Sequence, residues 1–292
     1  MASIYIGIIL CCRVLQHLCN KRASMQITGT ACFVKYSAYR QLLSAACGLL
    51  LIAVGGKGMQ WNLLTVLIST LSGITLIASM GFSMAALKAG TVALTALFGT
   101  AGILVPCIAG IFLFQEPMSL GQWFGIVLFF VAAYFLITSS SKIYCKITLK
   151  SIFLLIGVML ANGGTMLAQQ MFTFYVPGGS VSTFSFLSFG IVGIVMLVLS
   201  GVLPRTEGEN SKLSIHLIGY GAILSAAVFV INQLATILTA MVSPAVLFTF
   251  INGGSTVIGA IVAAVFFREK LTFRSIVGVT LGVISLVIIK VM

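Results

Sequence analysis

Ten apolar segments, most of them long enough to cross a lipid bilayer, dominate this chain of 292 residues. A crossing helix needs about 20 apolar residues to span the roughly 30 Å hydrocarbon core. Hydrophobic residues make up 60% of the chain and charged residues only 7%, which is too little polar surface to cover a soluble globule. The sequence therefore predicts an all-α integral membrane protein with ten transmembrane helices. The expected spans are residues 2–20, 29–55, 62–86, 89–114, 119–139, 149–172, 180–203, 213–238, 243–267 and 272–291.

A short motif occurs twice, at the end of the fourth span and at the end of the ninth. Phe-Gln-Glu-Pro-Met-Ser-Leu at 114–120 is followed by Gly125, and Phe-Arg-Glu-Lys-Leu-Thr-Phe at 267–273 is followed by Gly278. Because each copy contains an odd number of crossings, a tandem duplication places the copies in opposite orientations. We therefore expect two inverted five-helix repeats, 1–140 and 141–292, as in many secondary transporters.

Several segments carry a family resemblance. Ala-Leu-Lys-Ala-Gly-Thr-Val-Ala at 86–93, Pro106, the motif at 114–119 and Ser-Pro-Ala at 243–245 resemble the drug/metabolite transporter superfamily. The likeness is greatest to its ten-helix, EamA-like branch, whose halves are similar to small multidrug resistance proteins. The resemblance implies a secondary active transporter that works by alternating access. The leading expectation is an exporter of a small polar metabolite such as an amino acid. Multidrug efflux is the alternative within transport, and a passive channel or a membrane receptor or scaffold is the alternative from another class.

Basic residues indicate the orientation of the chain. The odd-numbered joints between spans hold eleven of the sixteen Lys and Arg residues, whereas the even-numbered joints and the termini hold two. The positive-inside rule then puts the odd joints in the cytoplasm and both termini outside. The family resemblance implies cytoplasmic termini instead, so both orientations remain open for a multi-pass protein of the cell membrane.

Charged and aromatic polar residues inside the first two spans are candidates for substrate binding. Charges within a membrane are costly and normally face a wet cavity or a partner. Arg13 and His17 are four residues apart on one helical face, as are Tyr36 and Arg40, and Lys35 lies beside them. A cavity lined by these groups would attract a carboxylate, a phosphate or a zwitterion. Snorkelling of the arginines to lipid headgroups, and a packing role for His17 in place of proton coupling, are the alternatives.

The second half supplies neutral polar candidates. Asn162 and Gln169 are seven residues apart and share a helical face, and Asn232 and Asn252 lie within later spans. Amides fix the orientation of a ligand without adding charge, although hydrogen bonding between helices is the alternative role. We include these four amides in the expected substrate site.

Other polar and small residues are expected to be structural. Glu116, Pro117 and Glu269 lie at span ends, where they can cap the following helix. The first span has no acid of the kind on which small multidrug resistance proteins rely, which disfavours lipophilic cations as substrates. Pairs of glycines four residues apart allow close helix approach in the fifth and tenth spans, within a monomer or a homodimer. These are Gly121, Gly125, Gly278 and Gly282.

No motif argues for enzymatic chemistry. The chain contains no aspartate, and its seven cysteines and two histidines show no zinc-site spacing. We expect no cofactor, no metal site and no nucleic-acid partner. The expected partners are the lipid bilayer, a small-molecule substrate and a possible coupling proton or ion.

Overall fold

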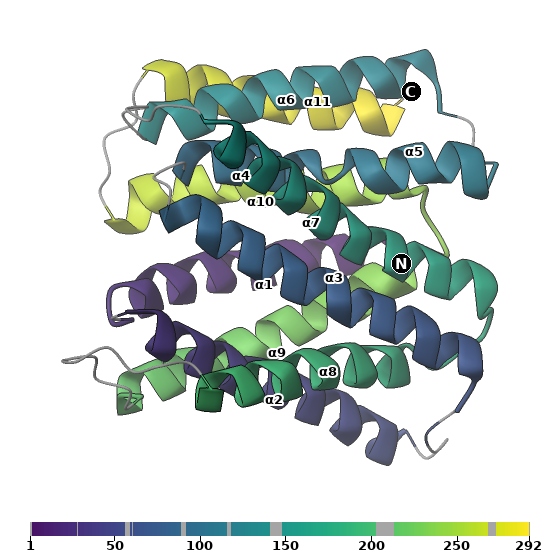
Figure 1. Ribbon diagram of the computed structural model, residues 1–292. Coiled ribbons are helices and arrows are strands. Elements are labelled where there is room, and N and C mark those ends of the chain that lie inside the picture. Colours follow the sequence, from purple (N-terminus) through teal and green to yellow (C-terminus); the bar gives the residue numbers. More distant parts are fainter. Residues whose placement is uncertain are drawn as a thin grey trace.

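Figure 1 shows the computed structural model of the chain, a bundle of α-helices. The structure describes residues 2–27, 29–55, 59, 61–88, 92–115, 118–140, 148–202, 213–267 and 273–291. These residues form eleven helices and no strand. The helices are α1 (Ala2–Ser24), α2 (Gly29–Val54), α3 (Leu63–Lys88), α4 (Val92–Ala101), α5 (Leu104–Leu113), α6 (Leu120–Ser140), α7 (Leu149–Tyr175), α8 (Val181–Val202), α9 (Ile215–Leu238), α10 (Pro244–Phe267) and α11 (Phe273–Val291).

The distribution of side chains is that of a protein in lipid. Six of the described helices, namely α1, α2, α3, α7, α8 and α9, are long and apolar enough to cross a membrane. Leu50 is 63% exposed and Phe112 is 79% exposed, whereas Ser185, Ser225 and Thr236 are completely buried. Large apolar groups outside and small polar groups inside suit a lipid solvent, because helices there associate through small and polar side chains. The chain is an all-helical, membrane-embedded protein.

Several helices begin with side-chain caps, and α7 and α9 are two of them. The hydroxyl of Thr148 accepts a hydrogen bond from the backbone N–H of Ser151 at 3.2 Å, at the start of α7. Ser214 accepts one from Leu217 at 3.1 Å, at the start of α9. Hydroxyl caps of this kind satisfy backbone donors that the first helical turn leaves free. Of the residues expected to cap helices, Glu116, Pro117 and Glu269 lie outside the described residues.

The structure divides the expected span 89–114 into α4 and α5. Pro106 has no backbone N–H to donate to the carbonyl of Gly102 four residues earlier, and that carbonyl accepts from Val105 at 3.0 Å instead. Gly102 and Ile103 also donate three residues back, to Gly99 at 3.3 Å and Thr100 at 3.2 Å. The result is a tight turn that separates two ten-residue helices.

Helices from the first and second parts of the chain interleave. α2 packs along α8, α6 along α11, α1 along α9 and α3 along α7. Figure 1 shows α6 and α11 side by side at one edge of the bundle, and both marked chain ends lie toward the same end of the helices. Each of these four helix pairs therefore joins the two halves of the sequence.

Glycines bring several of these helices together. A Cβ atom at Gly48 of α2 would lie 3.1 Å from the Cβ atom of Phe186 on α8. Gly125 of α6 faces Ile289 of α11, and a Cβ at Gly282 of α11 would meet Val257 of α10 at 2.9 Å. The remaining glycines of the expected packing faces, Gly121 and Gly278, lie on α6 and α11.

Candidate functional site

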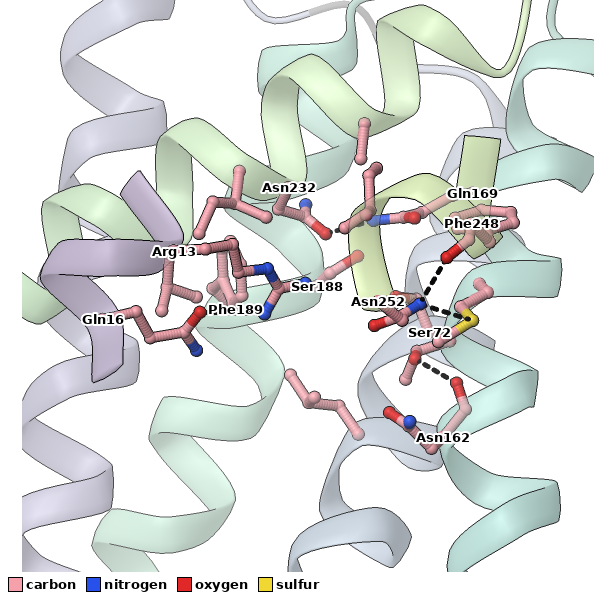
Figure 2. Close-up of a pocket in the computed structure, with 17 residues that line it drawn as sticks. Arg13, Gln16, Ser72, Asn162, Gln169, Ser188, Phe189, Asn232, Phe248 and Asn252 are labelled. Carbon is pink, nitrogen blue, oxygen red and sulfur yellow. Dashed lines mark hydrogen bonds between the residues drawn. The ribbon is translucent and has the colours of Figure 1, made fainter. Parts of the chain in front are cut away.

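A cavity of about 260 Å³ lies inside the bundle, between α1, α3, α7, α8, α9 and α10. Figure 2 shows its polar side chains converging from these helices. Its polar lining consists of Arg13, Gln16, Ser72, Asn162, Thr165, Gln169, Ser188, Asn232 and Asn252. Its apolar lining consists of Leu76, Met166, Phe189, Val228, Ile231, Ala235, Phe248 and Ile251. A small concave space with a few convergent polar groups is typical of a site for a small molecule.

Arg13 supplies the charge of this cavity. Its side chain extends from α1 toward the centre of the cavity, where Ser188 and Asn252 also lie (Figure 2). Its Nη1 donates to Oε1 of Gln16 at 2.8 Å, while its Nε is buried and has no hydrogen-bond partner. Gln16 comes from the same helix, one turn further on. The helix thus orients the guanidinium with one of its own amides and leaves the other donors for the cavity.

The charge of Arg13 has no counter-ion among the described residues. The chain has four acidic residues, Glu116, Glu207, Glu209 and Glu269. All four lie outside the described residues. The helices that line the cavity therefore contain no carboxylate, and the cavity carries a net positive charge.

A chain of amides and hydroxyls forms the wall opposite Arg13. Gln169 of α7 donates through Nε2 to Oδ1 of Asn232 on α9. Asn232 Nδ2 donates to the hydroxyl of Ser185 on α8 at 3.2 Å, and that hydroxyl donates to Oε1 of Gln233 at 3.1 Å. Gln233 Nε2 then donates to Ser182 at 3.0 Å. The chain links three helices and holds the amides of Gln169 and Asn232 in place at the cavity.

Asn162 connects the cavity to the turn between α4 and α5. Its Nδ2 donates to the carbonyl of Gly99 at 2.6 Å, next to the point where the helix ends. Asn252 of α10 donates to the carbonyl of Phe248 at 3.0 Å, with Met166 Sδ at 3.8 Å. Both amides therefore have structural bonds and a face on the cavity.

The structure brings together five of the nine expected substrate-binding residues and separates the other four. Arg13, Asn162, Gln169, Asn232 and Asn252 line the cavity. His17 does not line it, and its Nε2 lies 3.0 Å from the hydroxyl of Ser255 on α10. Lys35 is exposed on α2.

The buried Tyr36 and the half-buried Arg40 form a separate group. The guanidinium carbon of Arg40 lies 5.6 Å from the centre of the Tyr36 ring, and Tyr36 packs with Ala23, Cys32 and Leu217. The Nε of Arg40 and the hydroxyl of Tyr36 are buried without a hydrogen-bond partner. This stack lies between α2 and α9 and does not reach the cavity.

Sequence reasoning missed several cavity residues. Ser72 and Ser188 are single hydroxyls within apolar helices, and nothing in their spacing distinguishes them from packing serines. Gln16 had a usable signal, because it lies three residues after Arg13 on the same helical face. Within the described residues, no group of three or more His, Cys, Asp or Glu is placed to hold a metal ion.

Comparison with known proteins shows the fold and nothing more specific. No protein-family model and no curated protein sequence matches this chain. A solved structure described only as "Crystal structure of protein" matches it with a TM-score of 0.79, over 99% of this chain and 96% of that chain. The two sequences are 10% identical, so the likeness concerns the fold alone. The arrangement of the helices is therefore one that an experimental structure also has.

Proposed function

We propose that this chain is a secondary active transporter that carries a small polar metabolite across a membrane by alternating access. The observation that supports this most is the polar cavity inside a bundle of apolar helices. A half-buried cation and five amides are expensive to place at membrane depth, and such groups mark substrate pathways. The cavity volume of about 260 Å³ suits a metabolite, because sites for drug-sized ligands measure roughly 300–1,000 Å³.

We further propose ten crossings arranged as inverted repeats, residues 1–140 and 141–292. In that scheme α1, α2, α3, α4–α5 and α6 correspond to α7, α8, α9, α10 and α11. The packing pairs support it, because exchanging the halves turns the α1–α9 pair into the α3–α7 pair and leaves the α2–α8 and α6–α11 pairs unchanged. Close contacts exchange in the same way: Gly254 of α10 faces Leu10 of α1, and Gly102 faces Gly163 of α7.

The turn between α4 and α5 supports a transport role. Transporters often place discontinuous helices at the substrate site, where freed backbone groups are satisfied by protein or ligand. Here the carbonyl of Gly99 accepts from Gly102 in the turn and from Asn162, which also lines the cavity. Pro106, which creates the turn, is one of the residues that resemble the drug/metabolite transporter superfamily. We propose membership of its ten-helix, EamA-like branch on this basis.

The proposed carrier lies in the cell membrane and is driven by a gradient, with a proton or ion as the coupling partner. The distribution of basic residues favours odd-numbered joints on the cytoplasmic side. Export of amino acids or related metabolites is the starting proposal for its substrates. Multidrug efflux has less support, because the cation Arg13 repels lipophilic cations from the cavity.

Accessibility of the cavity from each side of the membrane tests the proposal without knowledge of the substrate. Thr165 is half-buried and lines the cavity, whereas Ser225 is completely buried between α9 and α2, away from it. Thr165→Cys and Ser225→Cys would be made in a chain whose seven native cysteines are replaced. A membrane-impermeant maleimide would then be applied to right-side-out and to inside-out vesicles.

A carrier that alternates exposes Thr165→Cys to the reagent from both sides, while Ser225→Cys stays unlabelled. Labelling of Thr165→Cys from one side only, or from neither, would remove alternating access and favour a receptor or scaffold. A passive channel is also labelled from both sides, and it is distinguished by the absence of counterflow in proteoliposomes.

A further inference from the structure

We infer that the cavity binds a small hydroxylated organic anion with a net negative charge, in preference to a neutral amino acid. This inference rests on the proposed function and narrows its substrate class. Three observations carry it: an arginine without a counter-ion among the described residues, the absence of any carboxylate in the described helices, and the direction of the amide hydrogen bonds on the opposite wall.

Arg13 requires a negative partner. A guanidinium has five N–H donors, of which one is used by Gln16 at 2.8 Å, and the donor on Nε is buried and unpaired. A buried charge without a partner is destabilising, and a carboxylate or phosphate can accept two parallel hydrogen bonds from the guanidinium fork. A ligand anion therefore satisfies donors that the described protein residues leave free.

The absence of acidic residues from the described helices also favours an anion over a zwitterion as the ligand. The ammonium group of a neutral amino acid would meet no carboxylate in the described helices, because none of these helices contains an acidic residue. A zwitterion would also leave the positive charge of the cavity uncompensated. A ligand with a net charge of −1 neutralises Arg13 and brings no second charge that needs a partner.

The opposite wall offers acceptors. Gln169 donates through Nε2 to Asn232, and Asn162 donates through Nδ2 to the carbonyl of Gly99. Both amides thus use their nitrogen on the protein, and Oε1 of Gln169 and Oδ1 of Asn162 accept no hydrogen bond from the described residues. Acceptors on this wall call for donors on the ligand. Hydroxyl groups supply them without adding charge, which points to hydroxy acids.

Glycerate, serine and glyceramide are matched probes because they share a three-carbon skeleton. Serine replaces the 2-hydroxyl of glycerate by an ammonium, and glyceramide replaces its carboxylate by a neutral amide. Gluconate and glycerol 3-phosphate extend the series to a longer hydroxy acid and to a phosphate. The purified full chain in lipid nanodiscs would be tested with each probe by thermal stabilisation and by calorimetry, since a ligand that binds the folded state stabilises it.

We expect at least one of the three anions to stabilise the protein and glyceramide to have no effect. Serine should bind at least about tenfold more weakly than glycerate. Arg13→Gln should weaken anion binding by about 30-fold or more, and Arg13→Lys should retain part of it. Arg40→Gln is the matched control, because Arg40 is a half-buried arginine like Arg13 but lies outside the cavity, and it should leave anion binding unchanged.

Three results would overturn the inference: serine binding as tightly as glycerate, no stabilisation by any of the three anions, or equal loss of binding in the Arg13 and Arg40 variants. A chain that binds serine while Thr165→Cys is labelled from both sides remains a carrier with a different substrate class. A chain that binds glycerate through Arg13 while Thr165→Cys is labelled from one side only keeps the anion site and loses the proposed transport.

Discussion

At two helix crossings beside the cavity a glycine allows close approach, but the atoms that it meets differ. In one, α1 crosses α10, and a Cβ at Gly254 would lie 2.8 Å from the tip of the Leu10 side chain. In the other, α7 crosses the α4–α5 turn, and a Cβ at Gly163 would meet the carbonyl oxygen of Gly102 and the side chain of Val105. The first crossing is a contact between a glycine and a flexible side chain, and the second is a contact between two backbones.

The hydrogen bond at each crossing differs in the same respect, since one joins two side chains and the other joins a side chain to the backbone. At the α1–α10 crossing the ring of His17 lies 3.0 Å from the hydroxyl of Ser255, so both partners are side chains. At the α7 crossing Asn162 bonds the backbone carbonyl of Gly99. Side chains can change rotamer and histidine can change charge, whereas a bond to a backbone carbonyl next to a helix break fixes position. The comparison suggests that the α1 crossing is adjustable and the α7 crossing is fixed.

Substitution of the glycines should show the largest difference between the crossings. Gly163→Ala forces a methyl group against the Gly102 carbonyl and Val105, and we expect a loss of about 1–3 kcal/mol in the free energy of unfolding. Gly254→Ala needs only a movement of the Leu10 side chain and should cost less than about 1 kcal/mol. Unfolding in mixed micelles, monitored by circular dichroism, measures both.

Gly190→Ala controls for the change in helix propensity, because nothing lies within 4 Å of a Cβ built there. Equal losses in the Gly163 and Gly254 variants, after correction by this control, would contradict the difference between backbone and side-chain contacts.

The next largest effect should come from Asn162. Asn162→Ala removes the side-chain donor from the Gly99 carbonyl and leaves it only the 3.3 Å bond from Gly102, which we expect to cost about 1 kcal/mol of stability. The substitution should also weaken ligand binding, since the same amide faces the cavity. Thr165→Val, which removes a neighbouring hydroxyl that bonds only within α7, is the matched control and should have a smaller effect on stability. Hydrogen exchange at Gly102 and Ile103 would increase only in the Asn162 variant if the amide holds the turn.

The sequence predicted the all-helical, membrane-embedded fold, because membrane depth fixes how many apolar residues a crossing needs. Six of the described helices are long and apolar enough to cross a membrane, and five of the nine expected binding residues line the cavity. The sequence did not reveal the turn at Gly102, since the residues on both sides are apolar and the break depends on a hydrogen bond that Pro106 cannot donate. Arg13 and Arg40 were equivalent in the sequence, both being cations within apolar spans. In the structure Arg13 lines the cavity and Arg40 does not. Contacts with helices distant in the chain decide which face of a helix meets the cavity.

His17 offers a smaller test of the adjustable crossing. Protonated His17 adds a positive charge one helical turn from Arg13, so anion binding should strengthen at the acidic pH values that protonate this half-buried ring. We expect glycerate to bind more tightly to the wild type at about pH 4.5 than at about pH 7.5, and His17→Gln to bind equally at both. His216, on α9, is the control, because its substitution by glutamine should keep the pH dependence. A His17→Gln variant with the full pH dependence would exclude this histidine as the source of coupling to protons.

The smallest effect should be that of Arg40. Its stack on Tyr36 contributes about 0.5–2 kcal/mol in desolvated surroundings, and Arg40→Gln should lower stability by no more than that amount. Tyr36→Leu removes the same stack from the other side, so the double variant should cost less than the sum of the single variants. The thermal unfolding midpoints of the three variants, each measured with and without glycerate, test this directly. The ligand-induced increase should stay constant across the series, because the stack stabilises α2 against α9 without contact with the cavity. A loss of that increase in either single variant would show that Arg40 and its stack also act on the ligand site. Arg13 would then no longer be distinguished from Arg40 as the arginine that binds the ligand.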